Sequence, residues 1–173
     1  MPAQSHFVPL SALTGEAFAP FGELVGPKNG GRPVNRGEAV RHDHVAHLVN
    51  LREASTANLA FFEVRRGRPP LSITWLERHP SSTQVFVPLS AGRFVVTVAP
   101  NDASARPDCA GAQAFLAGGG EGLTYRPGVW HHGLIPLDGA MRFAMLVWED
   151  GSAGDCEIVD LAAPLRVDCA RLV

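Results

Sequence analysis

Residues 77–88 read ERHPSSTQVFVP. Glu77 and His79 alternate along a short extended run, so we expect both side chains to leave the same face of a strand. Gln84 follows at the start of an apolar run that is typical of a second strand. The segment therefore predicts three polar side chains where one strand ends and the next begins.

A second segment, residues 122–132, reads GLTYRPGVWHH. His131 and His132 follow its Arg-Pro-Gly turn and, as neighbours on a strand, point to opposite faces, so at most one of them shares a pocket with His79. Together the two segments supply one carboxylate, two imidazoles and one amide. Such a set suits a divalent metal or a small polar substrate.

The composition predicts a globular chain with many turns. Of the 173 residues, 46% are hydrophobic and 18% charged, with 18 Gly and 14 Pro. We expect one domain over residues 1–173. The net charge of −2 comes with no basic stripe, so nucleic acid is not an expected partner. No apolar run reaches the roughly 18 residues of a membrane span. The cysteines lack metal or disulfide spacing, and the reducing cytoplasm is the expected location.

Many short strands and few helices are expected along the chain. Thr14 predicts the N-cap of a short helix that ends before Pro20. Residues 26–37 predict a long loop, and residues 90–92 predict a hairpin turn between strands at 84–89 and 93–99. The tail from residue 156 shows only a weak pattern. Further strands are expected at 6–10, 21–25, 40–48, 59–64, 71–76, 113–116, 122–125, 129–134 and 141–148. Short strands at regular spacing predict an all-β sandwich or barrel.

The strand expected at 40–48 is a weaker candidate for chemistry. His42 and His44 would share one of its faces and could bind a metal, but a half-exposed polar strand is the favoured interpretation.

The two segments resemble the paired motifs of the cupin superfamily, whose fold is a jelly-roll β-barrel. Glu77, His79 and Gln84 fit the ligand spacing of the first motif, with Glu in place of its first His and Gln in place of its Glu. Gly128 and His131 match the second motif, and this spacing selects His131 over its neighbour. The resemblance implies an all-β, cupin-like barrel with one or two short helices.

Within that superfamily, the sequence is most similar to one family. Residues 76–88 resemble the Leu-Glu-Arg-His-Pro…Gln-x-Phe-x-Pro signature of the ureidoglycolate lyases, and residues 129–132 resemble their Trp-His-His segment. The resemblance runs from about residue 7 to about residue 160. Residues 126–128 depart from it, since the family has a His-Arg-polar sequence there. Weaker similarities occur at Asn35, Gly37, Arg41, His42, Asp43, Arg65 and Leu71, and near Asp155 and Cys156.

This resemblance implies an enzyme that cleaves ureidoglycolate to glyoxylate and urea in allantoin degradation. It also implies a homodimer and a divalent metal, usually given as Ni²⁺. The implied metal ligands are Glu77, His79, Gln84 and His131. His132 or a metal-free Glu77 would move protons. The candidate substrate-binding residues are Gln84, Tyr125, Arg41 and Arg65, with Arg78 and Arg126 as further choices for the substrate carboxylate.

Several alternatives remain open at this point. The chain could be another metal-dependent cupin enzyme, an oxygenase or an isomerase, or a cupin that binds a small carboxylate without catalysis. Glu77 and His79 could form a surface ion pair, and Gln84 could orient a substrate by hydrogen bonding without touching a metal. Tyr125 could serve packing alone.

Overall fold

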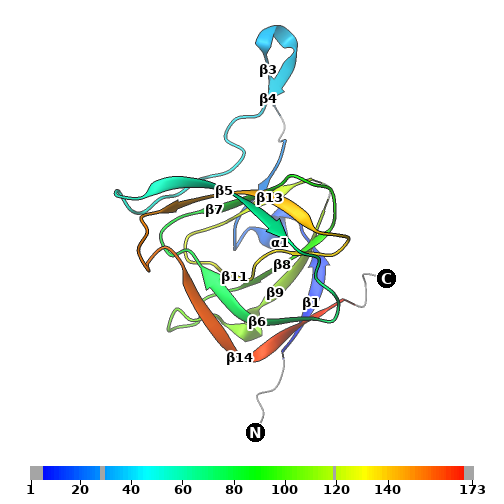
Figure 1. Ribbon diagram of the computed structural model, residues 1–173, viewed down its shortest axis with the longest axis vertical. Coiled ribbons are helices and arrows are strands. Elements are labelled where there is room, and N and C mark those ends of the chain that lie inside the picture. Colours follow the sequence, from blue (N-terminus) through cyan, green and yellow to red (C-terminus); the bar gives the residue numbers. More distant parts are fainter. Residues whose placement is uncertain (1–5, 28–29, 119, 170–173) are drawn as a thin grey trace.

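Two β-sheets form the body of the computed structural model, which describes residues 6–27, 30–118 and 120–169 (Figure 1). The larger sheet contains β1 (His6–Ala12), β6 (Leu71–Arg78), β8 (Phe94–Ala99), β9 (Gln113–Ala117), β11 (Trp130–His131), β12 (Ile135–Pro136) and β14 (Glu157–Asp168). The smaller sheet contains β2 (Leu24–Val25), β5 (Thr56–Val64), β7 (Gln84–Pro88), β10 (Gly122–Tyr125) and β13 (Met141–Glu149). Outside them lie α1 (Gly15–Phe18), the 3₁₀ helices η1 (Asn35–Gly37) and η2 (Cys109–Gly111), and the pair β3 (Arg32–Val34) and β4 (Ala39–Arg41).

Six strands of the larger sheet close into a ring. They follow the order β11-β6-β14-β1-β9-β8, and β11 also pairs with β8. β1 runs parallel to both of its neighbours, and the remaining pairs in the ring are antiparallel. All six strands contribute to one buried apolar cluster, which includes Val8, Leu71, Ile73, Leu76, Val95, Ala99, Ala114, Trp130, Leu165 and Val167. The expectation of an all-β barrel with a short helix is confirmed.

A second core lies between β8–β9 and the smaller sheet. It joins Val96 and Val98 of β8 to Phe143 of β13 and to the aromatic side chains of β7 and β10. Every residue of β8 is buried, since the two cores cover its opposite faces. β13 shows the alternation of a strand with one covered face, and its inward residues are Met141, Phe143, Met145 and Val147.

The predicted hairpin between residues 84–89 and 93–99 is wrong. β7 pairs with β10 and β13, whereas β8 pairs with β9, β11 and β12. The turn between them carries the chain from one sheet to the other. Turn composition marks a change of direction but does not say which strands pair after it.

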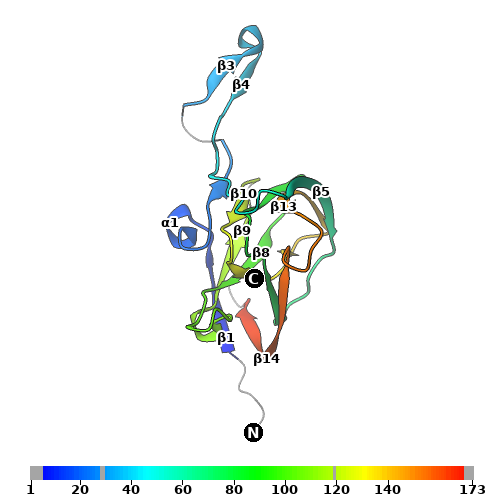
Figure 2. The same cartoon turned by 90° about the vertical axis from the view of Figure 1, so that its left-hand side faces the viewer.

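A hairpin arm, defined by residues 30–43, replaces the predicted loop and most of the strand expected at 40–48. β3 and β4 pair around η1, and Figures 1 and 2 show the arm projecting away from both sheets. Arg41 lies on this arm with an exposed side chain that pairs with Asp43. Asn35 and Arg36 both have positive φ, which gives the tight turn at the tip.

The weakly patterned tail contains the longest strand, β14, with 12 residues. It pairs with β6 on one side and β1 on the other. Its register shifts between Asp160 and Leu165, which interrupts the alternation by which a strand is recognised in a sequence. Thr14 caps α1 as predicted, because its hydroxyl accepts a hydrogen bond from the Ala17 N–H at 3.2 Å.

Candidate active site

Two cross-strand pairs, one in each sheet, build the candidate site. Glu77 of β6 lies opposite His131 of β11 in the larger sheet. Gln84 of β7 lies opposite Tyr125 of β10 in the smaller sheet. The two pairs meet where the Tyr125 ring stacks on the His131 imidazole, with ring centroids 4.0 Å apart and planes 10° apart. Residues far apart along the chain are thus brought together by strand register.

His79 joins these pairs from the segment that connects β6 to β7. Its ring lies 5.9 Å from that of His131, with an interplanar angle of 23°. The backbone N–H of Gly128 donates to the His79 carbonyl oxygen at 2.8 Å, which ties the turn before β11 to the end of β6. Gly128 has φ of +78°, a conformation that favours glycine. One ligand atom from each of Glu77, His79 and His131 lies within 4.8 Å of the others, and we name these three residues the cluster.

Both cluster histidines are held in one tautomer by the backbone. His79 Nδ1 lies 2.8 Å from the Asp155 carbonyl oxygen, and His131 Nδ1 lies 2.9 Å from that of Val129. A carbonyl oxygen only accepts, so each Nδ1 carries the hydrogen and donates it. Each neutral ring therefore presents a lone pair on Nε2, and both Nε2 atoms are buried without a hydrogen-bond partner among the described residues.

Neighbouring side chains of the cluster shift the protonation equilibria of Glu77 and His79. His131 Nε2 lies 3.5 Å from Glu77 Oε1, in a contact that does not meet hydrogen-bond geometry. Burial acts to raise the pKa of the Glu77 carboxyl, but the neighbouring histidines, His131 first, outweigh it and hold that pKa below its ordinary value. Burial and the proximity of His131 lower the pKa of His79. Near neutral pH the site thus pairs a carboxylate with a neutral imidazole on His79.

Gln84 and Tyr125 add two more polar atoms without partners. Gln84 Oε1 and the Tyr125 hydroxyl are buried and make no hydrogen bond to any described residue. Burial, together with the charge of Glu77, raises the pKa of the Tyr125 hydroxyl far above its ordinary value. The hydroxyl is therefore a neutral donor at any physiological pH. Buried polar atoms normally find partners, so four such atoms around one cluster indicate a binding site.

The remaining predicted residues lie outside the cluster. His132 packs against Trp75 with ring centroids 4.5 Å apart and planes tilted by 43°, and its Nδ1 lies 2.8 Å from the Gly133 carbonyl oxygen. Burial lowers the pKa of His132. Arg41 is on the arm, and Arg65 is exposed just beyond the end of β5. Their roles in binding substrate stay predictions.

Sequence reasoning missed two outer contacts of the cluster. The backbone of Asp155 accepts the hydrogen bond from His79, and Cys156 Sγ lies 3.8 Å from Glu77 Oε2. Burial and the nearby Glu77 raise the pKa of Cys156 to about 11, so it is a thiol that can donate to the carboxylate. The weak family similarity near residues 155–156 was the signal that pointed here.

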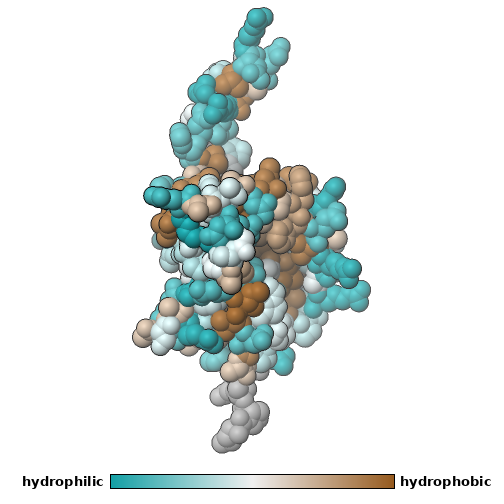
Figure 3. Space-filling model, turned by 60° about the vertical axis from the view of Figure 1, so that its left-hand side comes forward, coloured by the Kyte–Doolittle hydropathy of each residue, from teal (hydrophilic) through white to brown (hydrophobic). Residues whose placement is uncertain are grey.

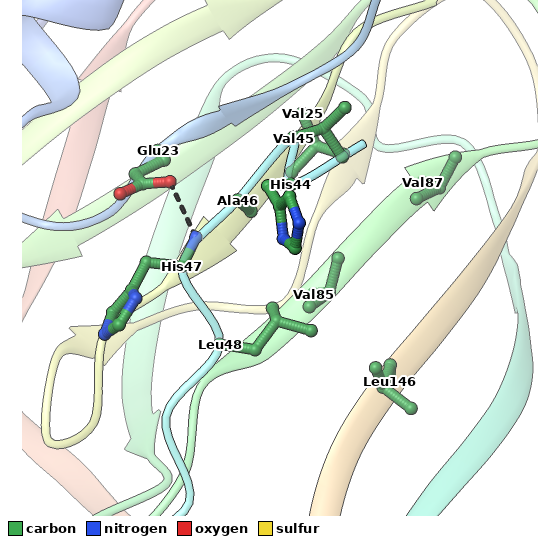
Figure 4. Close-up of a pocket in the computed structure, with 10 residues that line it drawn as sticks. All are labelled: Glu23, Val25, His44, Val45, Ala46, His47, Leu48, Val85, Val87 and Leu146. Atoms are coloured by element: carbon green, nitrogen blue, oxygen red, sulfur yellow. Dashed lines mark hydrogen bonds between the residues drawn. The ribbon is translucent and has the colours of Figure 1, made fainter. Parts of the chain in front are cut away.

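A cavity of about 910 Å³ lies elsewhere, on the outer side of the smaller sheet (Figure 4). Its floor is formed by Val85, Val87 and Leu146, and the segment after the arm covers it, with the backbone N–H of His47 donating to Glu23 at 3.0 Å. The cluster residues do not line it. Glu23, His44 and His47 also line this cavity, but it contains none of the four unpartnered polar atoms around the cluster, so the candidate active site is placed at the cluster.

The cluster fits the divalent metal that the family resemblance implies. Metal-binding histidines commonly donate one ring N–H to a carbonyl and present the other nitrogen to the ion, and both cluster histidines do this. The two free Nε2 atoms and the Glu77 carboxylate form a common donor set for Zn²⁺, Ni²⁺ and Fe²⁺. The orphaned Gln84 oxygen is compatible with the predicted fourth ligand.

The fold and the site define an all-β barrel protein with a buried histidine–carboxylate site of the kind that enzymes use. Comparison with known proteins specifies the family. A family model described as ureidoglycolate lyase matches residues 5–168. Relatives named ureidoglycolate lyase are 36% identical in Burkholderia cepacia, covering 86% of this chain and 83% of that one, and 34% identical in Schizosaccharomyces pombe, covering 90% and 92%.

The chain belongs to the ureidoglycolate lyase family and is an enzyme of the lyase class. The alternatives of an oxygenase, an isomerase or a non-catalytic binding protein are not favoured. Among solved structures, a dTDP sugar isomerase from Desulfovibrio desulfuricans G20 is similar with a TM-score of 0.47 and 19% identity, over 80% of this chain and 83% of that one. That likeness is too distant to add to the argument.

Proposed function

We propose that the cluster is the site at which this chain cleaves ureidoglycolate to glyoxylate and urea, a step of allantoin degradation. Family membership supports the reaction. The observation that supports the place is the convergence of Glu77 with two Nε2 lone pairs that have no partner in the described chain. In the proposed mechanism the carboxylate can accept a proton, and the two lone pairs can hold a metal that binds the substrate.

The substrate carbon carries a hydroxyl, a carboxylate, a hydrogen and a urea nitrogen. Cleavage removes the hydroxyl proton, forms the aldehyde carbonyl of glyoxylate and breaks the carbon–nitrogen bond. The electron pair of that bond leaves on the urea nitrogen, which takes up a proton. Atoms and charge balance without any other reactant, so the site must move one proton and hold the carboxylate.

Glu77 is the proposed base while it is free of metal; if it holds an ion, His132 is the proposed group that moves the proton. The Glu77 carboxyl is ionised near neutral pH because its pKa lies below the ordinary value, and 22% of its side chain remains exposed. The proton it takes from the hydroxyl is the one that the departing nitrogen needs, delivered by Glu77 itself or through His132. To orient the substrate, Gln84 Oε1 would accept a hydrogen bond from it and the Tyr125 hydroxyl would donate one to it.

A bound divalent ion would polarise the substrate oxygens and lower the pKa of the hydroxyl. Glu77, His79 and His131 would hold it, with Gln84 as the proposed fourth ligand. The fixed tautomers of the two histidines support this assignment, since neither ring has to rotate to present its lone pair. Ni²⁺ is the ion that the family resemblance implies.

The test is turnover of racemic ureidoglycolate, followed by release of both urea and glyoxylate. We expect Glu77→Gln to lower kcat by about 100-fold or more, because a general base contributes about 10²–10⁴-fold. Glu63→Gln is the matched control: this carboxylate on β5 is exposed and lies outside the cluster. Full activity in Glu77→Gln, or equal losses in both variants, would place the chemistry elsewhere.

We also propose a cytoplasmic homodimer. The outer face of the smaller sheet supports pairing, because Phe61 and Leu59 of β5 are 72% and 68% exposed and lie beside Ala144 and Leu146 of β13. Figure 3 shows apolar residues gathered on the body below the largely hydrophilic arm. Light scattering after gel filtration should give twice the chain mass for the parent and less for Phe61→Glu.

The cytoplasm is supported by the cysteines, which are all free thiols in the structure. None of the helices in the part of the chain that the structure describes has the length and apolar character needed to cross a bilayer.

A further inference from the structure

The loop of residues 150–156 folds around a single arginine from a distant part of the chain. Arg52 Nη1 donates to Asp150 Oδ2 at 2.7 Å, and Arg52 Nη2 pairs with Asp155 Oδ1. Nη2 also donates to the carbonyl oxygen of Trp148 at 3.4 Å, just before the loop begins. One guanidinium thus holds both ends of the loop together, with the planar, two-sided geometry that only arginine offers.

The carboxylate of Asp155 is the centre of this arrangement. Besides the guanidinium, it accepts the backbone N–H of Asp150 at 3.0 Å and that of Gly151 at 2.8 Å. These hydrogen bonds hold the pKa of Asp155 below its ordinary value. The side chains of Arg52 and Asp155 are only 20% and 13% exposed, so solvent competes with the pair less than it does on an open surface.

The backbone of the same loop touches two members of the cluster. The Asp155 carbonyl oxygen accepts the His79 Nδ1–H at 2.8 Å. The next residue, Cys156, places its thiol 3.8 Å from Glu77 Oε2, while the other oxygen of Glu77 faces His131. The position of the loop therefore decides which nitrogen of His79 carries the hydrogen and how the Glu77 carboxylate is turned.

We propose that Arg52 is a positioning residue of the active site, which clamps residues 150–156 so that the Asp155 carbonyl holds His79 with its Nε2 lone pair in the cluster. The expected loss of turnover rests on the proposed function of the cluster. The expected change in the tautomer of His79 does not. The distances above place Arg52 on the loop and not on the cluster, and its influence on turnover passes through His79.

Loss of the clamp has a specific chemical result. If the loop shifts, the Asp155 carbonyl no longer fixes Nδ1–H, and the neutral imidazole of His79 becomes a mixture of both tautomers. Only one tautomer presents a lone pair at Nε2, so the productive fraction of the protein falls. Removal of the hydrogen-bond partner of a metal-binding histidine costs about 10- to 100-fold in activity or metal affinity.

The experiment compares Arg52→Met, which keeps the apolar stem, with Arg52→Lys, which restores one ion pair but not both. The first readout is the ¹⁵N spectrum of His79 at about pH 8, above the ordinary pKa of histidine, assigned by the signals lost in His79→Gln. We expect the Nδ1–H form in the parent, a mixture in Arg52→Met and a partial return in Arg52→Lys. Ureidoglycolate turnover should fall about 10-fold in Arg52→Met and recover in the same order.

Arg93→Met is the matched control. Arg93, just before β8, also donates two hydrogen bonds to a carboxylate, that of Asp138. It should leave both the His79 spectrum and turnover unchanged. If Arg52→Met does not fold, Asp150→Asn provides a milder variant, because it leaves the Arg52–Asp155 pair in place. It should change the tautomer mixture of His79 in the same direction but less.

The outcomes separate the two proposals. A His79 spectrum like the parent's in folded Arg52→Met, or in Asp150→Asn if only that variant folds, overturns the positioning role. A parent protein that does not turn over ureidoglycolate overturns the proposed function, while the tautomer readout still decides the role of Arg52.

Discussion

Replacing Tyr125 with Phe should make the protein more stable and a poorer enzyme. The Tyr125 side chain is 1% exposed, and its hydroxyl has no hydrogen-bond partner among the described residues. A buried polar group without a partner costs about 1–3 kcal/mol of folding free energy. Phe keeps the ring that stacks on His131 and removes only the oxygen. We therefore expect a gain of about 1 kcal/mol in the free energy of unfolding, or about 2–4 °C in Tm for a chain of this size.

The same substitution removes a donor from the proposed substrate site. A hydrogen bond to a charged group is worth about 1.5–3 kcal/mol, which corresponds to about 10- to 100-fold in kcat/KM. The assays are urea release at varied ureidoglycolate concentration and thermal unfolding of the same samples. Opposite signs of the two effects are the signature of a polar group kept for function at the expense of stability.

Thr97→Val is the matched control for Tyr125→Phe. The Thr97 hydroxyl is also buried without a partner in the described chain, on β8, where the neighbouring even-numbered residues Val96 and Val98 face the second core. Its removal should stabilise the protein without changing kcat/KM. If Tyr125→Phe instead unfolds at a lower temperature, or keeps the parent's kcat/KM, then the hydroxyl has a structural partner and no part in substrate binding.

Three further perturbations follow from the structure. Dialysis against a chelator should lower urea release and a divalent ion should restore it; full activity in protein shown to be metal-free by elemental analysis would contradict a metal in the cluster. Phe143→Ala should cost about 3–5 kcal/mol in urea unfolding, since Phe143 is fully buried against two aromatic rings, whereas Phe7→Ala, at a side chain 78% exposed, should change it by less than about 0.5 kcal/mol. Asp138→Asn should lower Tm at neutral pH, because Arg93 depresses the pKa of Asp138 from 3.8 to about 2. A depressed pKa stabilises the folded state above pH 3.8, and this stabilisation is lost as the pH falls towards 2. The Tm values of the parent and the variant should therefore converge near pH 2.

The residues of the candidate site could be predicted from the sequence more fully than the strand pairing that brings them together. The alternation of Glu77 and His79, and the motif spacing to His131, placed three residues that the structure brings within 4.8 Å. Gln84 and Tyr125 were found as polar residues at strand ends, but their pairing across two strands depends on register, which turn composition does not specify.

The rest of the fold depends on contacts that leave no local pattern. β14 was missed because a register shift breaks its alternation, and the arm was missed because its few apolar residues do not make a strand-like run. The hydrogen bond from His79 to the Asp155 backbone could not be predicted, since any residue offers the same carbonyl. Long-range backbone contacts of this kind appear only once the chain has folded.

Closure of the ring leaves the larger sheet with very little unprotected edge. In the larger sheet, among the described strands, only the two-residue β12 lacks a second neighbour. The smaller sheet ends at β2, also two residues long, and at β5, which extends over nine residues and carries the exposed Leu59 and Phe61. Open backbone donors and acceptors beside bulky apolar side chains form a template for further strands. Aggregation through intermolecular β-pairing would therefore start along β5.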